Sequence, residues 1–456
     1  MQNWNRSSES STKPIPKVIA DLSWMEDSAV LGKDLSAELV KTRYAVRGKR
    51  NRYLENTTSN VTFHESQNPI KELSWEYRLL VLFRYWNIIE YFFPAKYMTD
   101  HNWNDVLTAH IPKFIEVESG LEWSKTVARL ISEINDTHAC SEWIPAFGDY
   151  GTDVMMSFIE NKLVATNATG GIKPGDEILT IDGKHPSEIK AKVAEYFSIS
   201  NEGGLLRQTA VYARRTNNQT ITITYISDGN TKTENFPTRL FRNGGPTQME
   251  TPSTRAFNTA FQLVEDGTIG YINAGYYVAT EASVMMNQFR NTKGIIIDMR
   301  IYPNSSMFSL TYGYFTNVIQ NFSQLGQTDA HTPGIVYLFG RSNAYTSNYS
   351  TYSGKVVVIV NENTQSNGEY VTMQLQTIPG CVTIGSQTAG ADGNISRFYI
   401  TNGLQTVISG LGVNYPDGTE TQRVGIRIDE IVKPTIAGIK AGKDELYERA
   451  VELIYQ

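Results

Sequence analysis

One serine stands where a buried strand is expected to run into a helix. Residues 356–360 are five aliphatic residues, VVVIV, and the polar loop NENTQSNGE that follows them carries Ser366. In an open α/β sheet, the end of such a strand meets a helix start, whose free N–H groups and dipole favour an oxyanion. Ser366 is therefore a candidate nucleophile. The alternative is structural, because Ser366 and Glu369 also match the helix-capping pattern S-x-x-E.

A serine nucleophile needs a base, because its hydroxyl is hardly ionised near neutral pH. Of the six histidines, His138 directly follows a predicted helix, in INDTH, and that helix end would hold it in place. The other five lie in a turn or in contexts without a recognisable motif: His64, His101, His110, His185 and His331. A structural role stays open for each histidine. The lipase-type elbow Gly-x-Ser-x-Gly is absent, since Thr364 replaces its first glycine.

Length, charge and cysteine content narrow the possible classes of function. The 456 residues predict two or three domains, and a net charge of −6 argues against a nucleic-acid partner. No apolar run approaches the roughly 18 residues of a membrane span. Cys140 and Cys381 are far apart and are expected to be ordinary buried thiols. Without a His-x-x-x-His pair or a Cys/His cluster, metal-dependent hydrolysis is disfavoured.

Four segments differ in their hydrophobic pattern. Residues 1–70 are polar and weakly periodic, whereas helical periodicity dominates residues 71–147, most clearly in EYRLLVLFRYWNIIEYFFP. Residues 148–240 are expected to form a mostly β module, with a hairpin turn near Glu160 and the alternating strand TITITYI. In residues 255–456, short β-branched strands alternate with helices, which predicts an α/β core with parallel crossovers.

The ordered set of motifs from about residue 76 onward resembles the C-terminal-processing and tricorn-type serine peptidases. After the helical segment these motifs are INDTHA, GIKPGDEILTIDG, GIIIDMR, NENTQSNGE, IGSQTAGADG and GTETQRVGIRIDEIVKPT. The resemblance implies a crossover protease core of the ClpP/crotonase-like kind. It also implies an N-terminal helical subdomain, an inserted PDZ-like domain that is mostly β, and no metal or organic cofactor.

By this resemblance TQSNGE is the nucleophile loop and Ser366 the nucleophile. The backbone N–H of Asn367 would be one oxyanion donor, and that of Ile301, in the loop after GIIIDMR, the other. Both positions depart from the family pattern, which has a small residue after the serine and glycines after the arginine. The Asp298 and Arg300 side chains are expected to hold the second loop.

The two branches of the family differ in their base. Tail-specific members use a lysine in the loop that follows IG..T.G, which here is residues 388–393, TAGADG. No lysine lies between Lys355 and Lys433, so this chain has no such dyad. The resemblance therefore favours the tricorn-like branch.

In the tricorn-like branch the base is a histidine preceded by a hydroxyl residue, and Thr137 and His138 match this pair. A glutamate late in the chain completes the constellation, and Glu420 is its candidate. The identity of this acid stays open between Glu420, Gln422 and Glu369. Thr137 and the acid would orient the imidazole and stabilise its cation.

GIKPGDEILTIDG also matches the PDZ-domain pattern, so residues 148–240 would bind an extended peptide as an added strand. The peptide carboxylate would lie near Gly151, Thr152 and Val154. A structural module without peptide affinity is the alternative. Residues 198–208, SISNEGGLLRQ, are expected to form a solvated loop leading into a helix, with substrate contact as the alternative.

These expectations combine into one function. We expect a serine endopeptidase that hydrolyses protein or peptide substrates through an acyl-enzyme on Ser366, with His138 as general base. The alternative is a catalytically inactive, peptide-binding relative of the same fold. No nucleic-acid partner and no transmembrane segment are expected. The resemblance implies a bacterial cell envelope or periplasm, although the N-terminus MQNWNRSSESSTKPIPK carries no signal-peptide core.

Overall fold

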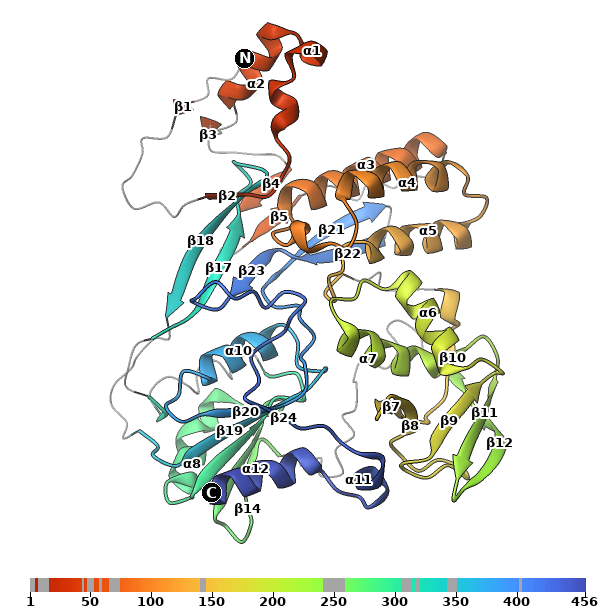
Figure 1. The fold of residues 1–456 in the computed structure, drawn as a ribbon, viewed down its shortest axis with the longest axis vertical. Helices are drawn as coiled ribbons and strands as arrows, with labels where there is room; N and C mark the ends of the chain where they lie inside the picture. Colours follow the sequence, from red (N-terminus) through yellow and green to blue (C-terminus); the bar gives the residue numbers. More distant parts are fainter. Residues whose placement is uncertain are drawn as a thin grey trace.

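A computed structural model describes most of the chain. The described residues are 5–6, 16–42, 45–46, 53–56, 60–64, 74–139, 145–240, 259–304, 314–316, 320–342, 351–401 and 404–456. Figure 1 shows a helical layer (orange) between the N-terminal helices (red) and two sheets that lie side by side. The sheet with the C-terminal helix (green to blue) carries the loop of Ser366, and the other (yellow to green) follows the helical layer in the chain.

The core is a six-stranded sheet in the order β14-β15-β16-β19-β20-β24. Its strands are β14 (Phe261–Val264), β15 (Ile269–Asn273), β16 (Gly294–Asp298), β19 (Lys355–Val360), β20 (Val382–Gly385) and β24 (Glu430–Ile431). All neighbours from β15 to β24 are parallel, and only β14 is antiparallel. The parallel α/β arrangement predicted for this part of the chain is confirmed.

Helices cover both faces of this sheet. Ile297 shares an apolar cluster with α8 (Ala282–Phe289) and α10 (Asn367–Leu375) on one face. Ile296, its neighbour in β16, packs on the opposite face with α12 (Glu445–Tyr455). Because both faces are buried, the strands need no polar alternation, which explains their continuous β-branched runs.

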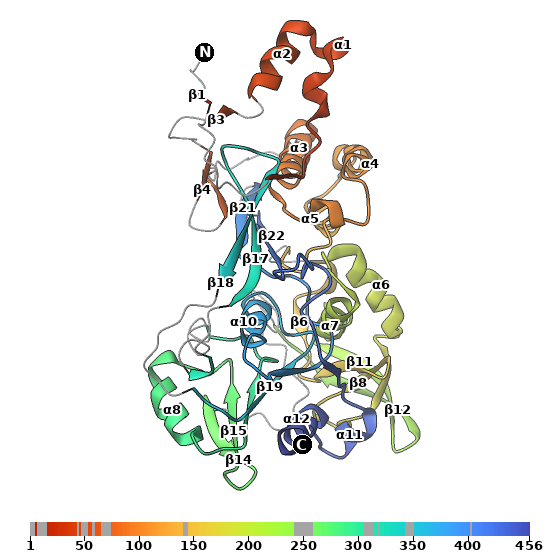
Figure 2. The ribbon, with the colours of Figure 1, turned by 60° about the vertical axis from the view of Figure 1, so that its left-hand side comes forward.

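The helical layer shares its core with a distant hairpin. The layer consists of α3 (Trp75–Phe92), α4 (Trp103–Ile115) and α5 (Gly120–Ser132), and the hairpin of β21 (Ile395–Thr401) and β22 (Leu404–Ser409). Phe398 and Ile408 of the hairpin lie in one buried cluster with Tyr85 and Leu130. Figure 2 shows the hairpin (blue) against these helices. Residues 71–147 therefore do not bury their apolar faces alone.

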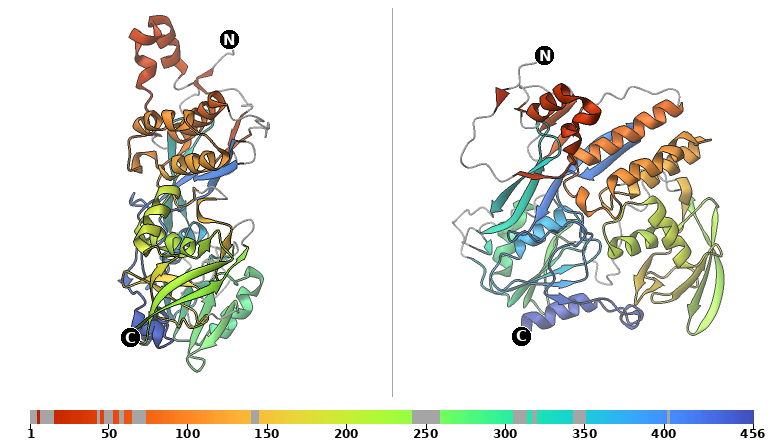
Figure 3. Two further views of the ribbon diagram at one scale, coloured as in Figure 1. Left: turned by 90° about the vertical axis from the view of Figure 1, so that its right-hand side faces the viewer. Right: turned by 45° about the horizontal axis from the view of Figure 1, so that its top comes forward.

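The N-terminal segment is also joined to later parts of the chain. A four-stranded sheet has the order β2-β18-β17-β23. Its strands are β2 (Pro16–Val18), β18 (Ile335–Ser342), β17 (Asn321–Thr328) and β23 (Leu411–Asn414). Figure 3 shows the β17–β18 hairpin (teal) extending from the parallel sheet toward the N-terminal segment. The short hairpin β4 (Leu54–Asn56) and β5 (Val61–Phe63) lies beside β21.

A second sheet is antiparallel and has the order β12-β11-β9-β8-β7. It contains β7 (Met156–Ile159), β8 (Lys162–Ala165), β9 (Glu177–Ile181), β11 (Thr220–Ser227) and β12 (Asn230–Pro237), with α6 (Pro186–Tyr196) and α7 (Glu202–Ala213) packed on it. Glu160 and Asn161 have φ of 52° and 64° in the β7–β8 turn. Two positive values suit the turn of a two-residue hairpin, so the predicted hairpin is confirmed.

The remaining elements are short. They are β1 (Asn5–Arg6), η1 (Ser23–Glu26), α1 (Ser28–Leu31), α2 (Lys33–Thr42), β3 (Ala45–Val46), η2 (Lys96–Met98), η3 (Pro145–Phe147), β6 (Tyr150–Gly151), β10 (Arg215–Thr216), β13 (Arg239–Leu240), η4 (Ala279–Glu281) and α11 (Ile436–Lys440). Within the described ranges, no helix combines the length and the apolarity that crossing a bilayer requires.

Candidate active site

Ser366 lies in the turn between β19 and α10, as the sequence predicts. Its backbone has φ 55° and ψ −121°, a strained conformation for a residue with a side chain. A serine that only caps a helix has an extended backbone, so capping alone does not explain this turn. Ser366 N donates to Ala391 O at 2.9 Å and to Glu369 Oε2 at 3.2 Å, and these bonds hold the turn in place.

Glu369 joins the turn of Ser366 to the loop of residues 388–393. It is fully buried, and its Oε1 accepts hydrogen bonds from Thr388 Oγ1 at 2.6 Å and Gly390 N at 2.9 Å. Its Oε2 accepts from Ala391 N at 3.1 Å. Burial raises the pKa of Glu369, and the four hydrogen-bond donors oppose that shift. These contacts place Glu369 under the turn, away from the position expected for an acid behind the base.

The loop after β16 is anchored by a buried ion-pair network. Arg300 Nη2 lies 2.7 Å from Asp298 Oδ2 and 2.8 Å from Asp444 Oδ2, and all three side chains are buried. Asp444 also caps the first turn of α12. The expectation that Asp298 and Arg300 hold this loop is confirmed, and Asp444 is a partner that the sequence pattern did not indicate.

A pocket of about 320 Å³ opens beside the turn of Ser366. Ser366 and Asn367 line it from the turn, and Tyr302 and Pro303 line it from the loop after β16. The rest of its lining is Leu325, Arg341, Tyr370, Asp392, Gly393, Asn394, Leu411 and Val413. Ile301 is not among these lining residues of the described chain, and its side chain lies against Gly275. Its backbone still belongs to the loop that forms one wall.

His138 belongs to a second cluster, in the loop after α5. Its Nδ1 lies 2.8 Å from Ser409 Oγ, and the Ser409 hydroxyl donates to Asp136 Oδ1 at 2.9 Å. The single hydroxyl hydrogen of Ser409 goes to the carboxylate, so His138 Nδ1 must be the donor to Ser409 Oγ. The lone pair of the neutral imidazole then lies on Nε2, where a general base needs it.

Asp136 is the carboxylate nearest to this imidazole among the contacts described, 3.9 Å from Oδ1 to His138 Nδ1. It is fully buried and also accepts from Ser409 N at 2.6 Å and His138 N at 3.1 Å. Burial lowers the pKa of His138, Asp136 opposes the shift, and Arg207 adds to it. The imidazole is therefore neutral near pH 7.

The acid predicted from the sequence lies elsewhere. Glu420 accepts a hydrogen bond from the Tyr97 hydroxyl and lies 3.8 Å from Lys17 Nζ, and no contact joins it to His138 in the described chain. Gln422 Nε2 reaches Asp136 Oδ1 at 3.3 Å. The expectation that Glu420 lies behind the imidazole is therefore wrong. The carboxylate beside the imidazole is Asp136, two residues before His138.

Thr137 also has a different partner from the one expected. Its hydroxyl donates to Ala389 O at 3.5 Å and accepts from Ser200 N at 2.8 Å, and Ser409 takes the place beside the imidazole. Ser198 Oγ accepts from Asp136 N at 2.7 Å, and Ser200 Oγ accepts from Thr137 N at 2.9 Å. Ser198 and Ser200 are buried, so the first residues of the segment 198–208 do not form the solvated loop that was expected.

Two features connect the clusters of His138 and Ser366. The loop of residues 388–393 contacts both, because Ala389 O accepts from Thr137 and Ala391 O accepts from Ser366 N. The second feature is the buried Arg207 of α7. Its positive charge acts on His138, and it donates from Nη1 to Glu362 O at 2.7 Å and from Nη2 to Gln365 Oε1 at 2.8 Å, in the loop before Ser366. No hydrogen bond joins His138 to Ser366 directly in the part of the chain that is described.

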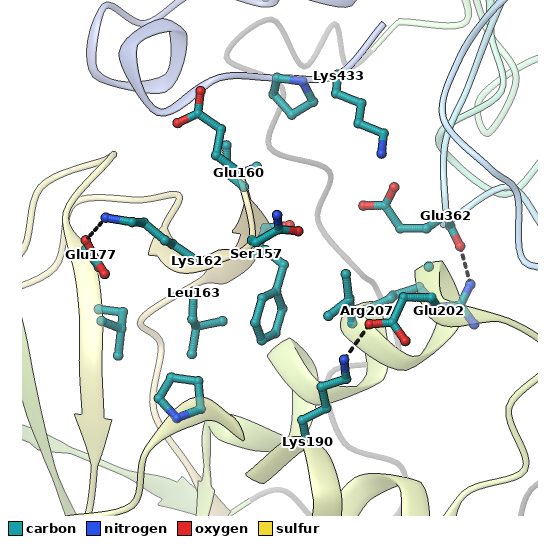
Figure 4. A pocket seen from close by; sticks show the side chains of 18 of the residues that line it. Ser157, Glu160, Lys162, Leu163, Glu177, Lys190, Glu202, Arg207, Glu362 and Lys433 are labelled. Carbon is teal, nitrogen blue, oxygen red and sulfur yellow. Dashed lines mark hydrogen bonds and ion pairs between the residues drawn. The ribbon is translucent and has the colours of Figure 1, made fainter. Parts of the chain in front are cut away.

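A larger pocket of about 540 Å³ lies between the five-stranded sheet and the core. Figure 4 shows Ser157 and Leu163 on the sheet side, Arg207 on α7, and Glu362 and Lys433 on the core side. The predicted peptide-binding residues Gly151, Thr152 and Val154 are buried and do not line this pocket.

The described chain holds no group of three or more His, Cys, Asp or Glu side chains arranged for a metal ion. Cys381 is free, and burial raises its pKa to about 12. Cys140 lies outside the described residues.

Comparisons with known proteins identify the family and the fold. The model of peptidase family S41 matches residues 200–432, more than half of the chain. The fold is similar to that of mature CPAF complexed with lactacystin, with a TM-score of 0.66 and 13% identity, over 84% of this chain and 98% of that one. A further structure of mature CPAF gives 0.63 and 12%, over 84% and 97%. A putative peptidase from Parabacteroides merdae gives 0.51 and 15%, also over 84% and 97%.

No curated protein matches the sequence. At these identities the structural neighbours show the fold alone, and the family model carries the classification. It gives no support to the alternative of an inactive relative. The chain belongs to peptidase family S41 and is a serine-type peptidase.

Proposed function

We propose that the protein is an endopeptidase that cleaves peptide bonds through an acyl-enzyme on Ser366, with His138 as general base. The observation that carries the proposal is the strained turn of Ser366, which lines a pocket at the end of β19. Strain of this kind persists only where the surrounding structure holds it, and nucleophile turns are one such place. The same proposal assigns residues 255–456 to a crossover, crotonase-like protease core.

The reaction uses the residues in the following roles. Ser366 Oγ attacks the carbonyl carbon while His138 Nε2 takes the hydroxyl proton. The backbone N–H groups of Asn367 and Ile301 stabilise the oxyanion of the tetrahedral intermediate. His138 then gives the proton to the leaving amine, the C–N bond breaks, and an ester remains on Ser366. Water, deprotonated by His138, hydrolyses this ester by the same steps in reverse order.

Ser409 and Asp136 orient the imidazole in this proposal. The chain of hydrogen bonds from His138 Nδ1 through Ser409 Oγ to Asp136 Oδ1 fixes the tautomer and stabilises the imidazolium cation. Thr137 ties the histidine loop to residues 388–393. Catalytic hydrogen bonds are often long without substrate, so the bond from Ser366 Oγ to His138 Nε2 is expected to form with a peptide in place.

A fluorophosphonate probe tests the nucleophile directly. The probe modifies an activated serine, so we expect one label on Ser366 in the wild-type protein, located by mass spectrometry of the digested chain. Ser366→Ala and His138→Ala should abolish labelling, whereas Ser124→Ala, in α5, should label like the wild type. Folded protein that never labels, or that labels at another serine, would contradict the proposal.

We also propose that residues 148–240 form a PDZ-like module whose peptide groove is the 540 Å³ pocket. Among the described strands, β7 pairs with β8 only and leaves its other edge open. Thr166 N donates to Met155 O at 2.9 Å. Because bonding alternates along an antiparallel pair, Phe158 then directs its N–H and C=O to the open edge. An extended peptide can pair there as an added strand, in place of the site expected near Gly151.

The charges around this groove favour recognition through the peptide main chain. Its lining holds as many basic as acidic side chains: Lys162, Lys190, Arg207 and Lys433, and Glu160, Glu177, Glu202 and Glu362. Several of them are paired with each other, including Lys190 with Glu202 and Lys162 with Glu177 (Figure 4). A groove without excess charge accepts many sequences.

Proline at the open edge tests the groove. Phe158→Pro removes the edge N–H and should weaken binding of fluorescein-labelled decapeptide mixtures at least tenfold, measured by anisotropy in the Ser366→Ala background. Thr231→Pro, at the opposite edge of the same sheet, is the matched control and should bind as before. Equal binding by both proline variants would exclude strand addition at β7. Peptides with amidated C-termini would show whether a free carboxylate contributes.

A further inference from the structure

A buried carboxyl group in the Ser366 pocket has one oxygen without a partner. Asp392 is 1% exposed and lines the pocket. Its Oδ1 accepts from Gly393 N at 2.6 Å, whereas its Oδ2 is buried and has no hydrogen-bond partner. A buried polar atom left unpaired is costly, and the proposed chemistry of Ser366 and His138 makes no use of it. A ligand group in the pocket would supply the partner that the described chain does not give this oxygen.

The surroundings of Asp392 favour a positively charged ligand group. Burial, followed by the negative charge of Glu369, raises the pKa of Asp392 well above its ordinary value. Among the residues that line this pocket in the described chain, Arg341 is the only cation. Arg341 is exposed on β18 and hydrogen-bonds to Tyr370, whose pKa it lowers against the larger effect of burial. The described lining of this pocket thus holds a buried acid, Asp392, but no buried cation.

The shape of the pocket restricts the ligand further. Leu325, Leu411 and Val413 are buried apolar residues of its wall, and Asp392 is its acidic group. A volume of about 320 Å³ accommodates one long side chain. Lysine and arginine combine an apolar stem with a cationic end, so they match both parts of this lining.

We propose that the pocket beside Ser366 selects a substrate residue with an apolar stem and a cationic end, lysine or arginine, and that Asp392 determines this specificity. The inference rests on the proposed function, because the pocket is a substrate pocket only if Ser366 is the nucleophile. A cationic end gives Oδ2 a partner and offsets the repulsion from Glu369. An apolar side chain would leave Oδ2 unpaired, and a neutral amide would bring no positive charge to Asp392.

Fluorogenic peptides that differ only in the residue before the cleaved bond test this specificity. In the wild-type protein, kcat/KM for the lysine or arginine peptide should exceed that for the norleucine peptide about tenfold or more. Asp392→Asn, which is nearly isosteric, should remove this preference and bring the ratio close to 1. Asp417→Asn, an exposed acid paired with Arg427, is the control and should keep the wild-type ratio. A norleucine preference in the wild type, or an unchanged ratio in Asp392→Asn, would overturn the inference.

Ligand binding separates this inference from the proposed function. Benzamidine carries a cationic amidinium, and benzamide is its uncharged counterpart. Calorimetry with the Ser366→Ala protein should show binding of benzamidine, none of benzamide, and loss of benzamidine binding in Ser366→Ala/Asp392→Asn. Wild-type protein whose Ser366 labels with fluorophosphonate but which binds both compounds equally refutes the specificity alone. Protein that does not label refutes the nucleophile, whatever the binding result.

Discussion

Replacement of His138 by alanine should lower kcat for peptide hydrolysis by about 10⁴- to 10⁶-fold. Without the imidazole, the Ser366 hydroxyl has no positioned group to take its proton, and the leaving amine has none to protonate it. Ser409 and Asp136 act only through the imidazole, so they cannot restore the lost proton transfer. Single-turnover and steady-state rates with a quenched fluorescent peptide measure the loss.

His101→Ala is the matched control for this substitution. His101 lies just before α4 and also contacts an acid, Glu133, but its side chain is 68% exposed, and no described contact joins it to Ser366. It should keep a rate close to the wild type. Thermal unfolding of His138→Ala shows whether the fold survives, because the substitution leaves Ser409 Oγ without its donor. A folded His138→Ala protein that retains about a tenth of the wild-type kcat would exclude His138 as the base.

The position of Ser366 between a buried strand and a helix could be predicted because its signals are local. An aliphatic run, a short polar loop and a helix follow one another within residues 356–376, and such local order survives folding. The strained φ of Ser366 could not be predicted, because it depends on hydrogen bonds to Ala391 and Glu369. Residue types locate the turn, whereas the tertiary partners determine its geometry.

The hydrogen-bond partners of His138 could be predicted only in part. Asp136 stands two residues before His138, within the motif INDTH, so this carboxylate could have been predicted. The resemblance pointed instead to a glutamate late in the chain. Ser409 is 271 residues from His138 and carries no motif. Ser409 lies beside His138 because the apolar residues of the β21–β22 hairpin pack against the helical layer. Packing between segments so far apart produces no sequence pattern around Ser409 that could have predicted this contact.

The same reasoning explains which parts of the fold were predictable. Continuous β-branched runs indicated strands buried on both faces, and the alternating TITITYI indicated a strand with one buried face. Segment boundaries drawn along the chain did not show that residues 395–409 complete the core of the helical layer. Hydrophobic periodicity reports which face of an element is buried, but not which distant element covers that face.

Asp136→Asn should lower kcat by about 10²- to 10⁴-fold and move the acidic limb of the pH–rate profile to lower pH. The imidazole must be neutral to act as base, so activity falls as pH drops through the pKa of His138. Burial places the pKa of His138 below its ordinary value of about 6.5, and Asp136 opposes that shift. Removing the negative charge of Asp136 therefore lowers this pKa further, while the imidazolium formed during the reaction loses its stabilisation.

The direction of the pH shift distinguishes a positioning role from general damage to the fold, because a misfolded site loses rate without moving the limb in a defined direction. Ser409→Ala provides a second variant in case Asp136→Asn does not fold, and it should reduce kcat about 10- to 100-fold by releasing Nδ1. Glu420→Gln compares the two candidate acids, since Glu420 contacts Tyr97 and not the imidazole. If Glu420→Gln costs more rate than Asp136→Asn, and Asp136→Asn leaves the limb in place, Glu420 is the acid and the chain of contacts through Ser409 is structural.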